Sequence, residues 1–229
     1  MPALIAMIRE ADALLAASLQ QYAAGGAFGD LFDMPEDNFA PEKLIGWDLS
    51  RWMADPATRV PLTSYLLHRL TGALRKSPTL LVMEEGFSIL DTPLFSMRAA
   101  AWLDYLAQNN AAAILTSADV EASATYPYTS SLAAKAATLF AMADRNPDAA
   151  SYSMGFGLTA EEVATLAYLP PAKHQVLQKR GGETVVINAS LDGLAAPLRQ
   201  TLSGKQPAAA ARSAADVLAE LMGYTPQTV

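Results

Sequence analysis

The chain has 229 residues, 52% of them hydrophobic and 17% charged, so it can bury a substantial core as one domain or one domain with a small appendage. Its formal net charge of -7 argues against direct nucleic-acid binding, because neutralising phosphates needs clustered Lys and Arg. The absence of cysteine excludes disulfide bonds and thiol chemistry, and two histidines are too few for a His-rich metal site.

The first part of the chain predicts two helices with a strand between them. Apolar residues at helical spacing predict a helix over residues 3–22. A short apolar run predicts a strand over residues 43–49. Asp55 followed by Pro56 is typical of a helix N-cap and first helical position, and it predicts a helix that runs to Leu74.

The middle of the chain alternates strand, helix and strand. Apolar runs predict strands over residues 79–83 and 111–115, and helical spacing predicts a helix over residues 91–109 between them. Together with the strand at residues 43–49 and the helix to Leu74, these elements give the order strand, helix, strand, helix, strand, which is typical of an α/β fold with a mostly parallel sheet and helices on both faces. In such folds, ligands bind at the carboxyl ends of the strands.

The remaining elements are predicted by the same spacing rules. They are a helix over residues 130–137, a strand over 138–142, a helix over 159–168, a hairpin of residues 174–178 and 183–189, and an alanine-rich helix over 208–222. No run reaches the roughly 18 consecutive apolar residues of a spanning helix, and the first residues lack a secretory signal pattern. We therefore expect a soluble, cytoplasmic protein.

Two adjacent acids, Glu84 and Glu85, directly follow the predicted strand at residues 79–83. Carboxylates at the end of a buried strand are how nucleotide triphosphatases hold magnesium and water, so this stretch predicts a Walker B element. No G-x-x-x-x-G-K-[ST] phosphate loop accompanies it, since residues 25–29 and 203–206 lack the spacing or the hydroxyl. The alternative is that the acids cap a helix N-terminus, where the helix dipole favours negative charge.

Several further segments, taken in order, resemble the type IV secretion and conjugal transfer ATPases of the VirB-four, TrbE and CagE group. The resemblance covers nearly the whole chain, and its carriers are residues 32–33, 61–69, 78–87, 90–95, 102–103, 155–159 and 202–204. Each segment is short, and their order and spacing together give the resemblance its specificity.

The resemblance implies that residues 1–205 are the C-terminal part of a RecA-like P-loop ATPase domain, with residues 206–229 as an alanine-rich link and C-terminal helix. The phosphate loop would then lie upstream of this chain. The family hydrolyses ATP with Mg²⁺ at the cytoplasmic face of the bacterial inner membrane, where it energises pilus assembly and substrate transfer. Its members work as oligomers with other secretion subunits, and their membrane association runs through those partners.

The resemblance also implies roles for single residues. Glu84 takes the place of the aspartate that holds magnesium through water, and Glu85 takes the place of the catalytic carboxylate that polarises the attacking water. Thr116 lies after the next strand, near the expected nucleotide. Arg145 is a candidate arginine finger toward a neighbouring subunit, with a solvated loop charge as the alternative.

Besides Glu84 in place of aspartate, the sequence departs from the family in two further places. The family usually has a glutamine after the strand at residues 111–115, where this chain reads Leu115-Thr116-Ser117-Ala118. Before that strand, where relatives usually carry Arg and Lys, this chain has residues 107–110 without a cation. Fewer donors near the phosphates would stabilise the transition state less well.

These departures keep a second hypothesis open, a non-catalytic docking or assembly module of a secretion complex. A third is an unrelated α/β small-molecule binder. Because it has no phosphate loop, the isolated chain is expected not to turn over ATP. Arg98, on the helix after the acids, is a weaker candidate of the same kind as Arg145. We expect the two histidines, His68 and His174, to be packing or surface residues, and the three tryptophans, Trp47, Trp52 and Trp102, to pack in the core.

Overall fold

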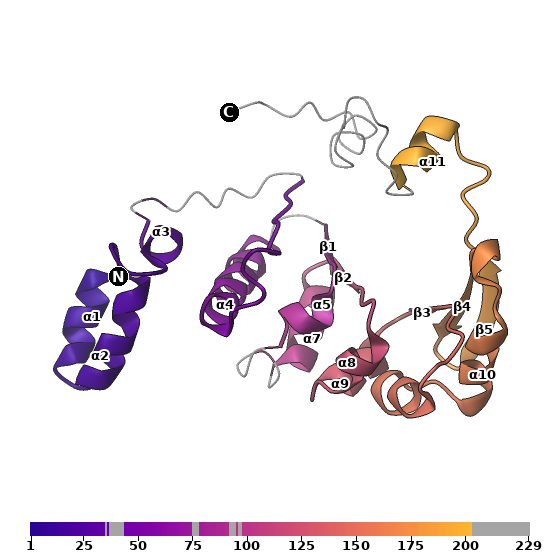
Figure 1. Ribbon diagram of the computed structural model, residues 1–229, viewed down its shortest axis with the longest axis horizontal. Coiled ribbons are helices and arrows are strands. Elements are labelled where there is room, and N and C mark those ends of the chain that lie inside the picture. Colours follow the sequence, from indigo (N-terminus) through magenta and orange to yellow (C-terminus); the bar gives the residue numbers. More distant parts are fainter. Residues whose placement is uncertain (35, 37–43, 75–77, 92–94, 96–97, 203–229) are drawn as a thin grey trace. The chain divides into compact units, whose positions relative to one another are not determined.

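The computed structural model describes residues 1–34, 36, 44–74, 78–91, 95 and 98–202 (Figure 1). These residues fall into two compact units, Met1–Arg75 and Lys76–Val229. Helices make up the regular structure described in the first unit, whereas the second combines helices with two small sheets. The chain is therefore mixed α/β, as predicted.

The first unit begins with two short helices in place of the single predicted helix at residues 3–22. Helix α1 spans Pro2–Arg9, helix α2 spans Ala13–Leu19, and a 3-10 turn follows at Gln20–Tyr22. The prediction of one helix was wrong because Asp12 is extended (φ -149°), and its carboxylate accepts a hydrogen bond from the Leu15 backbone N–H at 2.9 Å. This bond caps a new helix and breaks the old one.

The other elements of the first unit are helix α3 at Gly29–Phe32 and helix α4 at Pro56–Ala73. The prediction of α4 is confirmed, including its N-cap: Asp55 accepts a hydrogen bond from the Ala57 N–H at 2.9 Å. The predicted strand at residues 43–49 was wrong, because residues 44–49 form no strand; Lys43 lies outside the described residues. A strand needs a bonded neighbour, and the described part of this unit offers only helices.

The second unit opens with strand β1 at Thr79–Met83 and strand β2 at Ala111–Leu115, both as predicted. They pair in parallel, with Thr79 opposite Ala111 and Met83 opposite Leu115. Helices α5 at Gly86–Ile89 and α7 at Ala99–Gln108 lie on the connection between them.

The predicted continuous helix over residues 91–109 was wrong as a single helix, although Phe95 within it is helical. Asp91 is not helical, and α7 begins only after Arg98, whose backbone (φ -121°, ψ -1°) is non-helical. Residues 92–94 and 96–97 lie outside the described part of the chain.

The later predictions are largely confirmed. The elements are α8 at Val120–Ala124, α9 at Thr129–Lys135, β3 at Leu139–Met142, a π-helical turn η3 at Ser151–Gly155, α10 at Ala160–Tyr168, a 3-10 turn at Pro171–Lys173, β4 at Gln175–Arg180, β5 at Glu183–Asn188 and α11 at Ala196–Leu202. The sequence missed α8 and α11. The predicted helix at residues 208–222 lies outside the described residues.

The prediction of a mostly parallel sheet was wrong. Only β1 and β2 are parallel, while β3, β4 and β5 form an antiparallel sheet in that order. Strand β3 pairs with the predicted hairpin, with Leu139 opposite Lys179, instead of extending the parallel pair. Alternation of elements along a chain does not say which strands pair, so β3 was assigned to the wrong sheet. The RecA-like arrangement stays a prediction.

The main described core lies between the antiparallel sheet and α10, which covers one of its faces (Figure 1). Leu166 of α10 and Leu177 of β4 are almost completely buried there, together with Tyr152 of η3. This cluster anchors η3, and η3 in turn packs against α8 beyond the end of β2. In the described part of the chain, no helix is both long and apolar enough to cross a membrane.

Candidate functional site

The two predicted acids lie at the sharp turn where β1 passes into α5. The backbone of Glu85 adopts the left-handed conformation (φ 50°, ψ 37°), which non-glycine residues rarely use. Its carbonyl accepts hydrogen bonds from the N–H groups of Ser88 at 3.0 Å and Ile89 at 3.2 Å, which begin α5. The regular alternation of side-chain directions in the strand ends at this turn, so the orientations of the Glu84 and Glu85 side chains are no longer set by the strand, and each can have a different role.

The carboxyl ends of β1 and β2 are bonded tightly to each other. The Thr116 N–H donates to the Met83 carbonyl at 3.1 Å, and the Gly86 N–H donates to the Thr116 carbonyl at 3.0 Å. Gly86 allows this close approach, because an added Cβ would lie 3.1 Å from Leu115 Cγ. Thr116 is thus beside the acids, and its backbone makes these contacts; its role in nucleotide binding stays a prediction.

The carboxylate of Glu85 is held by the turn that follows β2. Its Oε1 accepts a hydrogen bond from the Ala118 N–H at 2.9 Å, and its Oε2 accepts one from Ser117 Oγ at 3.3 Å. Ser117 Oγ also lies 2.7 Å from Ser123 Oγ of α8. Glu85 occupies the N-cap position of α5, but its side chain makes no capping bond, so the helix-cap explanation does not describe its carboxylate.

The carboxylate of Glu84 is exposed and has no hydrogen-bond or ion-pair partner among the described residues. The same residues contain no group of three or more His, Asp or Glu side chains that would hold a metal by themselves. A single free carboxylate fits Mg²⁺ in one mode, in which the ion keeps several waters and takes its other ligands from phosphates.

The structure does not bring the remaining candidates to the acids. Arg145 is exposed on the loop after β3, in the antiparallel part of the unit, and no described contact joins it to Glu84 or Glu85. His68 and His174 are exposed, in keeping with the surface roles expected of them, and Arg98 is exposed too.

The tryptophans differ in their burial. Trp102 is buried against Phe95, with ring centroids 5.4 Å apart and an edge-to-face geometry, as expected of a core residue. Trp47 is 37% exposed, so its assignment to the core was wrong, because it lies in the irregular segment predicted as a strand. Trp52 is partly exposed, and the Arg51 guanidinium lies 4.8 Å from its ring centroid.

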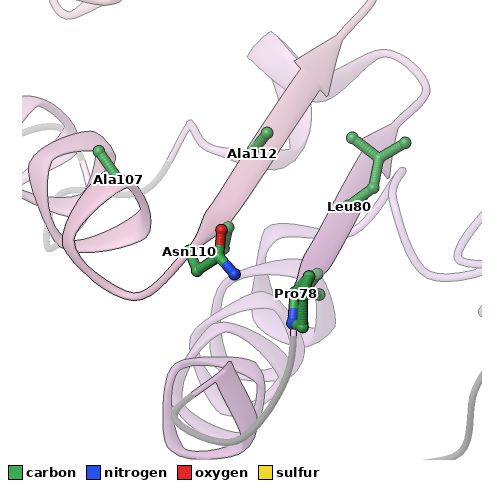
Figure 2. Close-up of a pocket in the computed structure, with 7 residues that line it drawn as sticks. Pro78, Leu80, Ala107, Asn110 and Ala112 are labelled. Carbon is green, nitrogen blue, oxygen red and sulfur yellow. The ribbon is translucent and has the colours of Figure 1, made fainter.

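A shallow depression of about 400 Å³ lies at the opposite, amino end of the parallel strands (Figure 2). Its lining is Pro78, Thr79, Leu80, Ala107, Asn110, Ala111 and Ala112. Figure 2 shows Pro78 and Asn110 at the starts of the two strands. Because the acids follow the other ends of these strands, this depression is separate from the candidate site, and it presents no ionisable side chain.

Sequence reasoning missed Ser117 and Ala118 as neighbours of Glu85. The sequence offered one indication of this segment's importance, because Ser117 lies where the family's glutamine is expected and missing. What could not be read from the sequence is that this segment turns back toward β1 and accommodates the Glu85 carboxylate.

Comparison with known proteins places the chain among secretion and transfer proteins. It is 25% identical over 166 residues to the type IV secretion system protein PtlC of Bordetella pertussis, covering 72% of this chain and 20% of that protein. It is 27% identical over 104 residues to the conjugal transfer protein TrbE of Rhizobium radiobacter, covering 45% and 13%. The type IV secretion system protein virB4 of Brucella abortus is 23% identical over 170 residues, covering 73% and 20%. The chain thus spans a fifth or less of these relatives, and no family model matches it.

Proposed function

We propose that this chain, a homologue of type IV secretion and conjugal transfer proteins, carries the acidic half of an ATP-hydrolysing site that energises pilus assembly and substrate transfer. In this proposal it is the C-terminal part of a RecA-like ATPase domain, and Glu84 and Glu85 are its Walker B carboxylates. The observation that carries the proposal is the division between the two acids at the end of β1. Glu85 is fixed by the next strand's turn, while Glu84 is free in solvent.

Glu85 is the group that activates water in this proposal. Each of its carboxylate oxygens accepts one protein hydrogen bond and keeps a further lone pair for a water molecule. As the water oxygen bonds to the γ-phosphorus, the bond to the β–γ bridging oxygen breaks, and its electron pair leaves with ADP. Glu85 accepts the proton that the water loses.

Glu84 supports the metal in this proposal. Its unpartnered carboxylate would accept hydrogen bonds from waters of a magnesium ion that is bound to the nucleotide phosphates. Such an ion would supply positive charge to the phosphates. Glutamate in place of the family's aspartate adds one methylene, which suits contact through water better than a fixed direct bond.

The family context extends the proposal to partners and location. We propose that the whole protein forms oligomers, works with other type IV secretion subunits and associates through them with the cytoplasmic face of the inner membrane. The net charge of -7 gives no reason to add direct nucleic-acid binding.

A non-catalytic docking or assembly module is the second candidate function. The missing glutamine favours it, and so does an apolar sheet face. Leu80 and Val82 of β1 are both 61% exposed, and Ile114 of β2 is 47% exposed. Parallel sheets usually have both faces covered, so an uncovered one is typical of a piece of a larger assembly.

The decisive experiment measures ATP hydrolysis by the longest protein that this chain's reading frame encodes. The Glu85→Gln variant keeps the size of the side chain but removes the base, so we expect kcat to fall by about 100-fold or more with little change in KM. Glu121→Gln, an exposed glutamate on α8, is the matched control and should leave kcat unchanged.

Two outcomes would favour the module. One is that wild type and Glu85→Gln hydrolyse ATP equally, and the other is that neither hydrolyses it although both are folded. Calorimetric titration of the isolated chain with magnesium ATP completes the test, because a chain without phosphate-loop amides should show no saturable binding.

A further inference from the structure

We propose that Ser117 is a positioning residue for Glu85, holding the catalytic carboxylate in the orientation in which it meets the attacking water. This inference rests on the proposed function, since it assigns Ser117 a role only through Glu85.

The first argument is the two-point contact between the turn and the carboxylate. Ser117 Oγ and the Ala118 N–H approach different oxygens of Glu85, at 3.3 Å and 2.9 Å. A carboxylate that accepts one bond rotates about it, whereas bonds to both oxygens fix its plane. The backbone N–H holds one oxygen in any variant, so the hydroxyl decides whether the plane is fixed.

The second argument is the position of the Ser117 hydroxyl proton. Three acceptors surround Ser117 Oγ: Glu85 Oε2, the Asp119 carbonyl at 3.0 Å and Ser123 Oγ at 2.7 Å. One hydroxyl carries one proton, so it serves one of them at a time. When Ser123 donates its own proton to Ser117, the Ser117 proton is left to Glu85 or to the Asp119 carbonyl. When Ser117 donates elsewhere, Glu85 keeps only its bond to Ala118.

The third argument is that the residues around Ser117 are themselves held in place by hydrogen bonds. Ser123 is 3% exposed, and its carbonyl accepts a hydrogen bond from Thr129 Oγ1 of α9 at 2.6 Å. The Asp119 N–H donates to Ser117 Oγ at 3.2 Å, while the Asp119 carboxylate caps α8 through the Ala122 N–H at 2.8 Å. Ser117 Oγ is therefore held between Ser123 and Asp119, and only the direction in which its proton points can vary.

The consequence is kinetic. A carboxylate that rotates out of its plane polarises the water in a smaller fraction of complexes, although nucleotide binding is unaffected. Loss of the Ser117 hydroxyl should therefore lower kcat and leave KM unchanged, the pattern of an interaction needed for the transition state.

The test uses the longest protein encoded by the reading frame. We expect Ser117→Ala to reduce kcat about tenfold at constant KM, because a hydrogen bond to a charged acceptor is lost while the Ala118 bond stays. Ser117→Thr keeps the hydroxyl and should restore most of the rate. Ser130→Ala, which removes an exposed hydroxyl on α9, is the control and should not change kcat.

A double-mutant cycle separates positioning from a structural effect. If Ser117 acts through Glu85, then Ser117→Ala should cost nothing further in the Glu85→Gln background. Equal losses in both backgrounds would overturn the inference, and so would an unchanged kcat in Ser117→Ala. The amide resonance of Ala118 in the isolated chain reports its hydrogen bond to Glu85, and it should shift in Glu85→Gln but not in Ser130→Ala.

Failure of the two proposals can be told apart. If Glu85→Gln abolishes hydrolysis while Ser117→Ala does not slow it, only the positioning role is wrong. If Glu85→Gln hydrolyses ATP like wild type, the proposed function is wrong, and the role of Ser117 fails with it.

Discussion

Glu85 combines an unfavourable backbone conformation with two side-chain contacts. The left-handed conformation costs a non-glycine residue about 1–2 kcal/mol. Its carbonyl begins α5, and its carboxylate receives hydrogen bonds from Ser117 and Ala118. A glycine here would relieve the backbone but would remove the carboxylate, so the strain coincides with the residue that the proposed chemistry needs.

Glu84 offers a separate prediction, because its carboxylate is free of protein partners in the described structure. Glu84→Gln should raise the Mg²⁺ concentration that gives half-maximal ATP hydrolysis by about 10–100-fold, the usual cost of losing an outer-shell metal contact. A titration of turnover with Mg²⁺ at saturating ATP measures this shift. A variant with normal magnesium dependence but reduced kcat would instead assign Glu84 to the chemical step.

The acids could be predicted from the sequence, but their surroundings could not. Two glutamates after an apolar run form a local sequence pattern, because the strand and the acids are adjacent in the chain. The contacts of Glu85 come from Ser117 and Ala118, which reach it only because β2 pairs in parallel with β1. A long-range pairing of this kind leaves no local pattern in the residues that it brings together.

The N-terminus of α10 shows how one carboxylate joins several elements. Glu162 and Thr159 form a capping box, and Glu162 also accepts hydrogen bonds from Thr184 and from Lys179 Nζ at 2.7 Å. Burial of Glu162 raises the pKa of its carboxyl, but these bonds and the Lys179 charge outweigh it and hold the pKa below its ordinary value of 4.5. Helix and hairpin are thus fastened by an ionised group.

A pH-dependent stability follows from this lowered pKa. The stabilisation is fully present above the pKa of the unfolded state, and it is lost as pH falls through the lower pKa of the folded state. Glu162→Gln should therefore destabilise the chain by about 1 kcal/mol at pH 7, and by much less near pH 3. Urea unfolding at both pH values tests this, with the exposed neighbour Glu161→Gln as control. Equal destabilisation at the two pH values would contradict it.

Helices and strands were predicted correctly where a local sequence pattern marks them. Helix α4 was predicted because it begins with a recognisable cap at Asp55, and helix α10 because of its apolar spacing. The prediction of one helix over residues 3–22 failed because a cap was overlooked: Asp12, within the apolar pattern, caps a second helix. The segment at residues 44–49 is apolar without being a strand, because composition alone does not provide a partner.

The exposed face of the parallel pair concerns the molecule as a whole. Leu80 and Val82 lie on the same side as their register partners Ala112 and Ile114, and the larger three side chains are 47–61% exposed. A contiguous apolar face on a chain that spans a fifth or less of its relatives is prone to association.

Replacing Val82 and Ile114 by threonine should therefore reduce self-association of the isolated chain, because it makes this face polar. The free energy of unfolding should change by no more than about 0.5 kcal/mol per site, as for other exposed positions. Sedimentation velocity across a range of protein concentrations measures the association. Leu81→Thr, on the opposite and more covered face, is the contrast and should mainly lower stability. Unchanged association in the double variant would show that other surfaces cause it.

The contacts at the carboxyl ends of β1 and β2 have a consequence for strand alignment. Most strands are aligned by alternation of polar and apolar residues, but both sides of this pair are predominantly apolar, as residues 79–83 and 111–115 show. If β1 shifted by one residue against β2, apolar side chains would still face apolar side chains on both faces of the pair, so the pattern alone would not oppose the shift. The shift would, however, separate the Gly86 N–H from the Thr116 carbonyl and Glu85 from Ala118. The polar groups of the proposed active site thus also fix the register of the sheet that carries them.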